Sequence, residues 1–252
     1  KNAAYRYEML AEIMKINEKA FEDYIKQKIK TKKPITFKEV EATFIRLKKT
    51  QEREEREEKA TKRKFDGERY RLIMSDISSL ITKIDPGTVD AIVTDPPYSS
   101  EYVGLYSTLS KTAATLLKPG GSCIVMTGQA HLPQILSALS EHLSYQWLLA
   151  YLCAGASTQV FGRRVKSNWK PLVWMVNGKS TWEHIDDIVR SDEPDKRFHD
   201  WGQSESGMAA IVSKFTYAKD LILDPFCGPG TTGVAALALD RRFIGADNDN
   251  CC

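Results

Sequence analysis

The sequence Asp-Pro-Pro-Tyr, which ends at Tyr98, places a carboxylate, two prolines and an aromatic ring directly after a predicted strand. Residues 91 to 94 are a short apolar, largely β-branched run of the kind that forms buried strands. Pro96 and Pro97 cannot donate ladder hydrogen bonds, so the strand ends there, and their fixed φ makes the turn stiff. Such a turn holds the Asp95 carboxylate as a hydrogen-bond acceptor close to the Tyr98 ring, as a binding or catalytic site requires.

A second stretch, DPFCGPGTT, begins at Asp224 after an apolar run and leads into an alanine-rich segment. Gly228 and Gly230 would let the backbone come close to a ligand. A helix beginning at Thr231 would offer unpaired N–H groups and a partial positive charge to a carboxylate or phosphate. The stretch is neither the dinucleotide GxGxxG motif nor a P-loop, because no Gly-Lys-Ser/Thr follows. It predicts a cofactor-binding loop.

A third candidate, Asp247, ends the predicted strand of RRFIGADND, about twenty residues beyond Asp224. This distance fits a βαβ unit whose second strand presents an acid to a ribose hydroxyl. Taken alone, an Asp after a strand is more often a turn residue or a helix cap. The role of Asp247 therefore depends on its position relative to the glycine-rich stretch.

The elements that must position these residues are strands alternating with helices. Helical runs are predicted at Tyr106 to Leu117 and Leu132 to His142. The predicted strands are Arg71 to Met74, Ala91 to Thr94, Ser122 to Met126, Trp147 to Leu152, Leu172 to Val176, Leu221 to Leu223 and Arg242 to Ala246. This alternation indicates an α/β fold with an open, mostly parallel sheet covered on both faces. Ligands of such sheets bind at the carboxyl ends of the strands.

The N-terminal region, residues 1–64, differs from the rest in composition and charge. Residues 1 to 65 carry 19 Lys and Arg against 12 Asp and Glu, although the whole chain has a net charge of only +3. Amphipathic spacing predicts helices over residues 4 to 30 and from Thr36 onward, where Glu39 completes a capping box. Residues 48 to 64 are almost wholly polar, with charge pairs at i,i+4 spacing. This segment is interpreted as a solvated helical spacer, a phosphate-contacting helix or a partner-binding coiled segment.

Several classes of protein are disfavoured by composition. No apolar run approaches the roughly 20 residues that cross a bilayer, and the N-terminus lacks the apolar centre of a signal peptide. We therefore expect no membrane association and a cytoplasmic location. The five cysteines form no CxxC pair and have no histidine cluster beside them, so no metal site is expected.

The two motifs together resemble the S-adenosylmethionine-dependent amino-methyltransferases that modify exocyclic amines of DNA bases. DPPY comes first and the glycine-rich motif last, which is similar to the permuted β group of that family. The resemblance covers residues 65–252 and implies a Rossmann-like, mostly parallel seven-stranded sheet with helices on both faces. Similarity at "YRLIMSDISSL" implies that Asp76 contacts the adenine of the cofactor. The cofactor, S-adenosylmethionine, would be bound by Asp76, Asp224, Pro225, Phe226, Gly228, Gly230, Thr231 and Asp247.

The resemblance also assigns the DPPY residues to catalysis. An exocyclic amine is a poor nucleophile, because its lone pair is delocalised into the base. The Asp95 carboxylate and the Pro96 carbonyl can accept its two N–H bonds and direct the lone pair at the sulfonium methyl. Pro97 stiffens the turn, and Tyr98 offers a flat face to a base flipped out of the duplex. Transfer then rests on positioning and electrostatics, without a covalent enzyme intermediate.

The partner implied is double-stranded DNA, and a homodimer is left open. In the family DPPY goes mostly with adenine N6, so adenine is the expected target and cytosine N4 the alternative. The family's target-recognition region corresponds to about residues 177–200, which are short and largely acidic here. We therefore assign phosphate contacts to Arg163, Arg164, Lys166 and Lys170, with a mobile solvated loop as the alternative, and expect Trp169 to pack in the core.

Two other functions remain open at this point. The same fold acts on RNA or on a protein glutamine in related enzymes, although the protein enzymes usually carry Asn where this chain has Asp95. The basic helical N-terminus also resembles segments that follow partition-protein-like domains in some phage and plasmid methyltransferases, which allows a DNA-binding protein without catalysis. The biological role, whether restriction partner, phage protection or epigenetic mark, is equally open.

Overall fold

The computed structural model divides the chain into two units, Lys1–Lys64 and Phe65–Cys252. Of the first unit only Glu22, Lys26 and Lys30 are described; all three are helical and exposed, and Lys26 pairs with Glu22 at 3.0 Å. The helices predicted for residues 1–64 otherwise lie outside the described residues. In the second unit the structure describes residues 67–152, 158–182, 184–191 and 204–248.

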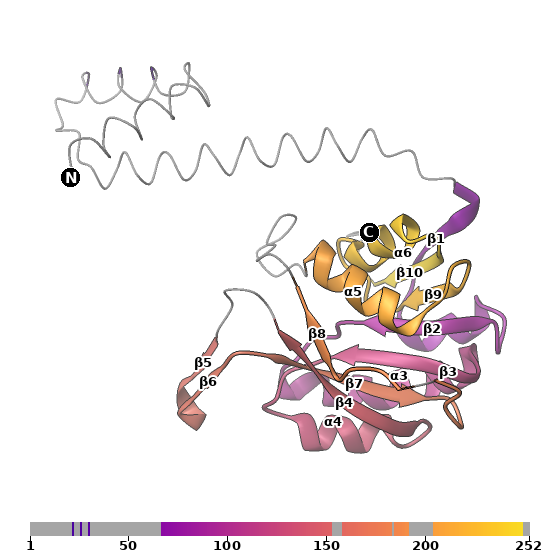
Figure 1. Cartoon of the computed structure of the whole chain (residues 1–252), viewed down its shortest axis with the longest axis horizontal. Coiled ribbons are helices and arrows are strands. Elements are labelled where there is room, and N and C mark those ends of the chain that lie inside the picture. The colour runs from indigo at the N-terminus through magenta and orange to yellow at the C-terminus, as the bar shows by residue number, and fades with distance from the viewer. Residues whose placement is uncertain are drawn as a thin grey trace. The chain divides into compact units, whose positions relative to one another are not determined.

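An eight-stranded sheet in the order β1-β10-β9-β2-β3-β7-β4-β8 forms the centre of the second unit (Figure 1). Neighbouring strands are parallel except at β7, which is antiparallel to both β3 and β4. The strands are β1 Tyr70–Met74, β2 Val89–Thr94, β3 Leu117–Met126, β4 Ser144–Leu152, β7 Lys170–Val176, β8 Ile188–Arg190, β9 Leu221–Asp224 and β10 Arg242–Asp247. A separate two-stranded sheet pairs β5 Thr158–Val160 with β6 Val165–Ser167.

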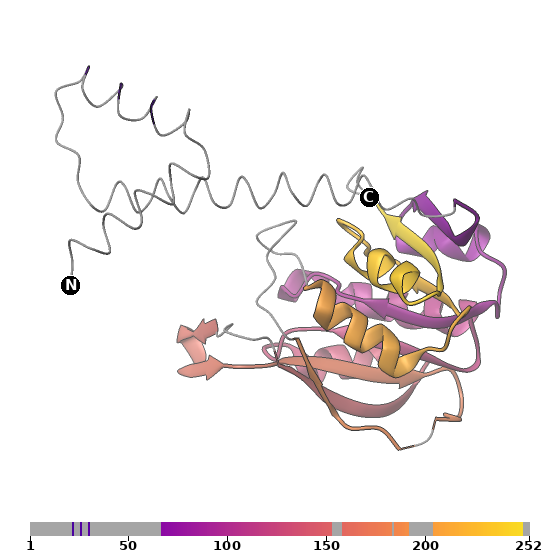
Figure 2. The same ribbon diagram turned by 45° about the horizontal axis from the view of Figure 1, so that its top comes forward.

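Helices cover both faces of the large sheet, as Figures 1 and 2 show. One face packs against α3, Val103–Leu116, and α4, Leu132–Leu139. The opposite face packs against α5, Glu205–Phe215, and α6, Thr231–Ala238. Because both faces are covered, the central strand β2 is buried at five of its six positions. Short 3-10 turns complete the unit: η1 Gly67–Arg69, η2 Ile77–Thr82, η3 Ser100–Tyr102 and η4 Phe161–Arg163.

The α/β class, all seven predicted strands and both predicted helices are confirmed. The helices differ only at their ends, since α3 begins three residues before Tyr106 and α4 ends three residues before His142. The sheet has one strand more than the expected seven, because Ile188–Arg190 pairs in parallel with the outer strand β4. This strand was missed because its three residues are too few to set up a periodic pattern. No described helix is long and apolar enough to cross a membrane.

Candidate functional site

The predicted acidic residues meet at one edge of the large sheet. Strands β1, β10, β9 and β2 are neighbours and run parallel, so their carboxyl ends face the same way. Asp247 and Asp224 end β10 and β9, while Asp76 and Asp95 follow β1 and β2. The register places Met74 opposite Asp247 and Gly245 opposite Asp224. The candidate cofactor residues and the DPPY turn therefore lie along the same edge of the sheet.

Asp224 connects the two motifs through a fully buried carboxylate. It accepts hydrogen bonds of 2.6 Å from the Thr94 hydroxyl, 2.6 Å from the Thr232 hydroxyl and 3.1 Å from the Phe226 N–H. Burial raises the pKa of Asp224 to about 6, against the opposing effect of the two hydroxyls. Because Thr94 immediately precedes Asp95, the carboxylate ties the DPPY turn to the first turn of α6. Its side chain is thus engaged within the protein, and Asp224 supports the loop.

The glycine-rich loop presents open backbone at the start of α6. Gly228 and Gly230 have φ of 44° and 79°, in the left-handed region that favours glycine. A Cβ placed on either glycine would meet no atom within 4 Å, so the loop borders free space. The Gly228 N–H donates to the Asp247 carboxylate at 2.9 Å. Pro225 and Thr231 are buried and Phe226 is half-buried, so these three residues shape the loop from below.

Asp76, two residues after the end of β1, caps the turn η2. Its exposed carboxylate accepts from the backbone N–H of Ser78 and Ser79 at 3.0 and 3.2 Å, and from both their hydroxyls. These hydrogen bonds, chiefly from the serine hydroxyls, lower the pKa of Asp76 to about 2. The Ser75 N–H donates to the Asp247 carbonyl at 2.8 Å, which links the ends of β1 and β10. Asp76 is therefore held as an anion beside Asp247.

In the DPPY turn, the Tyr98 hydroxyl donates a hydrogen bond to the Asp95 carboxylate. Both side chains are half-buried, and Pro96, which follows Asp95, is buried. The Lys170 ammonium, at the amino end of β7, lies 3.4 Å from the Tyr98 hydroxyl and 5.4 Å from the centre of its ring. Lys170, predicted to contact DNA phosphate, therefore lies against the DPPY turn itself.

Tyr106 fixes the turn from α3, a contact that the sequence did not indicate. Its buried hydroxyl lies 3.2 Å from the Pro97 carbonyl oxygen and 3.2 Å from the Thr127 hydroxyl. Burial raises the pKa of Tyr106 to about 12, so the phenol stays protonated and is able to donate. The Pro97 carbonyl is thus bonded within the protein. The neighbouring Pro96 carbonyl, by contrast, accepts no hydrogen bond from the described residues.

A cavity of about 670 Å³ opens beside Tyr98. Its wall continues through the loop after β3 and through Val160, Arg163 and residues 165 to 170, which include Lys166 and Lys170. Arg164 is exposed but is not part of this wall, and it has a φ of 54°. The prediction that Trp169 packs in the core is wrong, because the indole lines the cavity and is 36% exposed. The structure thus brings a basic, partly aromatic surface to the DPPY turn.

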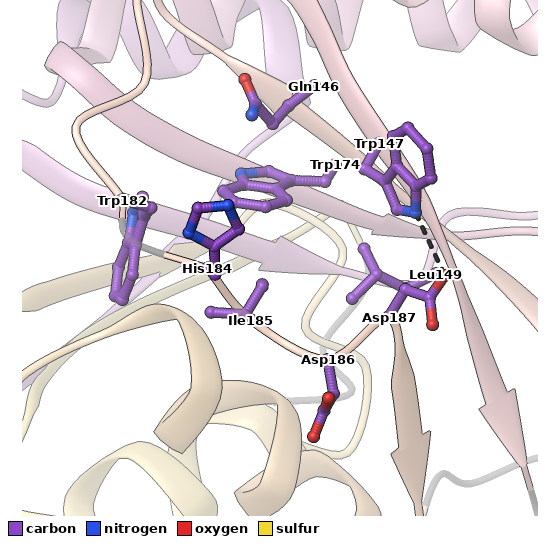
Figure 3. Close-up of a pocket in the computed structure, with 9 residues that line it drawn as sticks. All are labelled: Gln146, Trp147, Leu149, Trp174, Trp182, His184, Ile185, Asp186 and Asp187. Atoms are coloured by element: carbon purple, nitrogen blue, oxygen red, sulfur yellow. Dashed lines mark hydrogen bonds between the residues drawn. The ribbon is translucent and has the colours of Figure 1, made fainter.

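The described part of the expected target-recognition region, residues 177–182 and 184–191, lies elsewhere. Its Trp182 packs edge-on against Phe215 and stacks on Tyr217 at 5.2 Å. Figure 3 shows this segment beside the indoles of β4 and β7, around a pocket of about 450 Å³ that shares no lining residue with the cavity at Tyr98. Asp187 accepts from the Trp147 indole N–H at 3.3 Å.

Comparison with known proteins agrees with this geometry. Residues 89–251, more than half of the chain, match the family described as DNA methylase, of the N6/N4 type. The chain belongs to the N6/N4 DNA methylase family. It is therefore an S-adenosylmethionine-dependent DNA amino-methyltransferase, of the kind that acts on adenine N6 or cytosine N4. Among the described residues no group of three or more potential ligands could hold a metal ion.

Two bacterial relatives align with most of the chain. The type II methyltransferase M2.LlaDCHI of Lactococcus lactis subsp. cremoris is 24% identical over 238 residues, covering 75% of this chain and 88% of the relative. The type II methyltransferase M2.DpnII of Streptococcus pneumoniae is 23% identical over 236 residues, covering 74% of this chain and 88% of the relative. The relatives are thus matched over most of their own length.

Solved structures share the fold. The M1.HpyAVI–SAM complex aligns with a TM-score of 0.60 at 24% identity, covering 72% of this chain and 94% of that one. The cytosine-N4-specific PvuII DNA methyltransferase aligns with a TM-score of 0.62 at 15% identity, covering 72% and 82%. At these identities the likeness concerns the fold alone, which is that of an α/β methyltransferase.

Proposed function

We propose that this protein transfers the methyl group of S-adenosylmethionine to the N6 amine of a flipped-out adenine in double-stranded DNA. The observation that carries the proposal is the buried hydrogen bond between Thr94 and Asp224, which fixes the Asp95 acceptor beside the glycine-rich loop. A methyl donor bound at the loop and an amine bound at Asp95 would then be neighbours at the same edge of the sheet, which supports the proposal. Cytosine N4 is the alternative target, and the fold likeness to a cytosine-N4-specific enzyme keeps it open.

We assign the cofactor to the loop around Gly228 and Gly230, and the open backbone there supports this assignment. Its free space accommodates a ligand close to the backbone, and the start of α6 offers N–H groups to the methionine carboxylate. Asp247, at the end of β10, is placed to accept from ribose hydroxyls, and Asp76 from the adenine amine. When bound, the cofactor supplies an electrophilic methyl group on a sulfonium.

The DPPY turn makes the amine nucleophilic. The Asp95 carboxylate and the Pro96 carbonyl accept hydrogen bonds from the two N–H groups of the amine. These hydrogen bonds draw the nitrogen toward a tetrahedral geometry with its lone pair free. Held at the glycine-rich loop, the sulfonium of the cofactor would supply its methyl group to this lone pair and leave as a neutral thioether. The methylated nitrogen, positively charged at that moment, loses one proton, for which Asp95 is the adjacent acceptor. Tyr106 and Pro97 keep the turn rigid throughout.

Tyr98 must change partners for the base to enter. In the structure its hydroxyl occupies the Asp95 carboxylate, which is the place proposed for the amine. Entry of the base into the neighbouring cavity would displace this hydrogen bond and leave the ring as a stacking face. Stacking contributes about 1–3 kcal/mol per base and offsets part of the cost of flipping.

The experiment that tests the proposal measures transfer of labelled methyl from S-adenosylmethionine to unmethylated duplex DNA, with RNA as a parallel acceptor. Digestion to nucleosides and mass analysis identify the product. We expect N6-methyladenine, and a loss of roughly 100-fold or more in Asp95→Ala, since a transition-state acceptor is removed. Asp85→Ala, an exposed turn residue before the same strand, is the matched control and should retain activity.

The other products would each correct a different part of the proposal. N4-methylcytosine would keep the mechanism and overturn the target base. Methylated RNA with unmodified DNA would overturn the substrate. Cofactor binding without transfer to either acceptor would favour a DNA-binding protein without catalysis.

A further inference from the structure

The β5–β6 ribbon, residues 158–167, is a small antiparallel sheet of its own. Thr158 pairs with Ser167, Gln159 with Lys166 and Val160 with Val165, and η4 with Arg164 closes the tip. In Figures 1 and 2 the ribbon projects away from the large sheet. A projecting two-stranded ribbon is one of the shapes that the major groove of B-DNA, about 12 Å wide, admits.

The ribbon carries the charge that DNA binding requires. Arg163, Arg164 and Lys166 are exposed, and residues 158 to 170 contain no acidic residue. The side chain of Val165 is also exposed, at 55%, although it is apolar. Gln159 is exposed and lies directly across the ribbon from Lys166. Side chains able to reach bases and phosphates therefore share one projecting element.

The ribbon is fastened to the loop after β3, at its base through Ser167 and from its tip through Arg163 of η4. The Gln129 amide donates to the Ser167 hydroxyl at 2.8 Å and to the Trp169 carbonyl at 2.7 Å. The Arg163 guanidinium donates to the Ala130 carbonyl at 3.0 Å. Gln129 and Ala130 belong to the loop after β3, which lines the cavity next to Tyr98. A base held in that cavity would therefore have the ribbon as its neighbour.

The region in which the family recognises its target is poorly suited here to contact DNA. Its described part comprises residues 177–182 and 184–191. Trp182 and Ile185 are packed against the core, and β8 is part of the large sheet. The exposed side chains of Asp186 and Asp187 would repel phosphate. The pocket of Figure 3 is also distant from the DPPY turn. Trp174, which lines this pocket, is four residues along β7 from Lys170, the neighbour of Tyr98, which is roughly 13 Å at about 3.3 Å per residue.

We infer that the β5–β6 ribbon enters the major groove and reads the bases that flank the flipped target. This inference rests on the proposed action on duplex DNA. Arg164 at the tip and Gln159 would contact base edges, since arginine pairs with guanine and glutamine with adenine in that groove. Lys166 would contact phosphate, because its flexible side chain presents the ammonium to a phosphate as a point charge. The ribbon, rather than residues 177–191, then sets the recognition sequence.

The test compares ribbon variants with matched variants of the competing segment. Arg164→Gly removes the side chain and keeps the tip, since glycine favours its φ of 54°. Gln159→Ala removes the other base contact. Lys179→Ala and Arg190→Ala, both exposed, remove equivalent positive charges from residues 177–191. Each full-length protein is incubated with a randomised duplex library, and the bound and the methylated sequences are determined separately.

The inference predicts that ribbon variants relax the preference at particular base positions. The expected change is about 5- to 150-fold per position, which corresponds to the 1–3 kcal/mol of a good base contact. The two control variants should keep the preference of the unchanged protein. Selective binding without methylation would support the ribbon and count against the proposed methyl transfer, so the two can fail separately.

Three results would overturn the inference. Weaker binding with a reduced salt slope and an unchanged preference in the ribbon variants would limit the ribbon to phosphate contacts. A changed preference in Lys179→Ala or Arg190→Ala would return recognition to residues 177–191. A protein that binds and methylates all sequences equally would leave the ribbon nothing to read.

Discussion

The Thr94 hydroxyl donates a 2.6 Å hydrogen bond to Asp224 in the buried interior, and this bond joins the strand before the DPPY turn to the strand before the glycine-rich loop. On the other side of the same carboxylate, Thr232 donates at 2.6 Å from the first turn of α6. The three side chains form a bridge from the strand that precedes Asp95, the residue proposed to bind the amine, to the proposed cofactor loop. Because the bridge is buried, water cannot replace a lost partner. Removing either threonine hydroxyl should therefore destabilise the folded state.

Thr94→Val and Thr232→Val each remove one donor to Asp224 and preserve the shape of the side chain. We expect each to lower the free energy of unfolding by about 1–3 kcal/mol, because a buried carboxylate loses a hydrogen bond. Thr94→Val should mainly lower kcat, since Thr94 precedes Asp95, whereas Thr232→Val should mainly weaken cofactor binding. Urea denaturation, calorimetric titration of the cofactor and steady-state kinetics measure the three quantities. Equal effects of both variants on both parameters would contradict the division of roles.

The raised pKa of Asp224 predicts a dependence of stability on pH. With a pKa of about 6 in the folded chain and 3.8 as the ordinary value, the folded state binds the extra proton. The contribution of Asp224 to stability is therefore greatest below pH 3.8 and is lost as the pH rises through 6. Asp224→Asn removes this titration, so its stability relative to the unchanged protein should improve from pH 5 to pH 7.5 by on the order of 1 kcal/mol.

Asp240→Asn is the matched control for this measurement, since the Lys219 ion pair lowers the pKa of the exposed Asp240 carboxyl. A group with a lowered pKa contributes stability above its ordinary pKa and loses it as the pH falls. Its relative stability should therefore be unchanged between pH 5 and pH 7.5. An improvement of the same size in both variants would show that the effect is not specific to the buried carboxylate.

Gly230→Ala tests whether the open space beside the glycine-rich loop belongs to a ligand. An alanine at φ of 79° is strained by roughly 1 kcal/mol, and its Cβ would point into that space. Gly87→Ala is the matched control, because Gly87 has φ of 65° and equally open surroundings in a turn before β2. Both variants should lose similar stability, and only Gly230→Ala should weaken S-adenosylmethionine binding, by about tenfold or more. Equal binding by the two variants would place the cofactor away from Gly230.

The sequence was sufficient for elements with strong local signals and insufficient for contacts between distant residues. The run before Asp95 is apolar and β-branched, so its strand and the end of that strand could be predicted. The contact of Lys170 with Tyr98 joins residues 72 positions apart, and the Thr94–Asp224 bond joins residues 130 positions apart. Such contacts depend on which strands are neighbours, and no local pattern encodes strand order. The ribbon was missed because its strands have only three residues each.

Tyr98 has two proposed roles that substitution can separate. Tyr98→Phe removes the hydroxyl that occupies Asp95 and keeps the ring, so turnover should be retained or increased. Tyr98→Ala also removes the stacking face and should lower kcat/KM by about 5- to 150-fold, equivalent to 1–3 kcal/mol. Steady-state methylation of duplex DNA compares the two variants. A target base in a mismatch flips more easily, so on such a substrate the difference in kcat/KM between the two variants should be smaller. If Tyr98→Phe were as impaired as Tyr98→Ala, the hydroxyl rather than the ring would be the essential group.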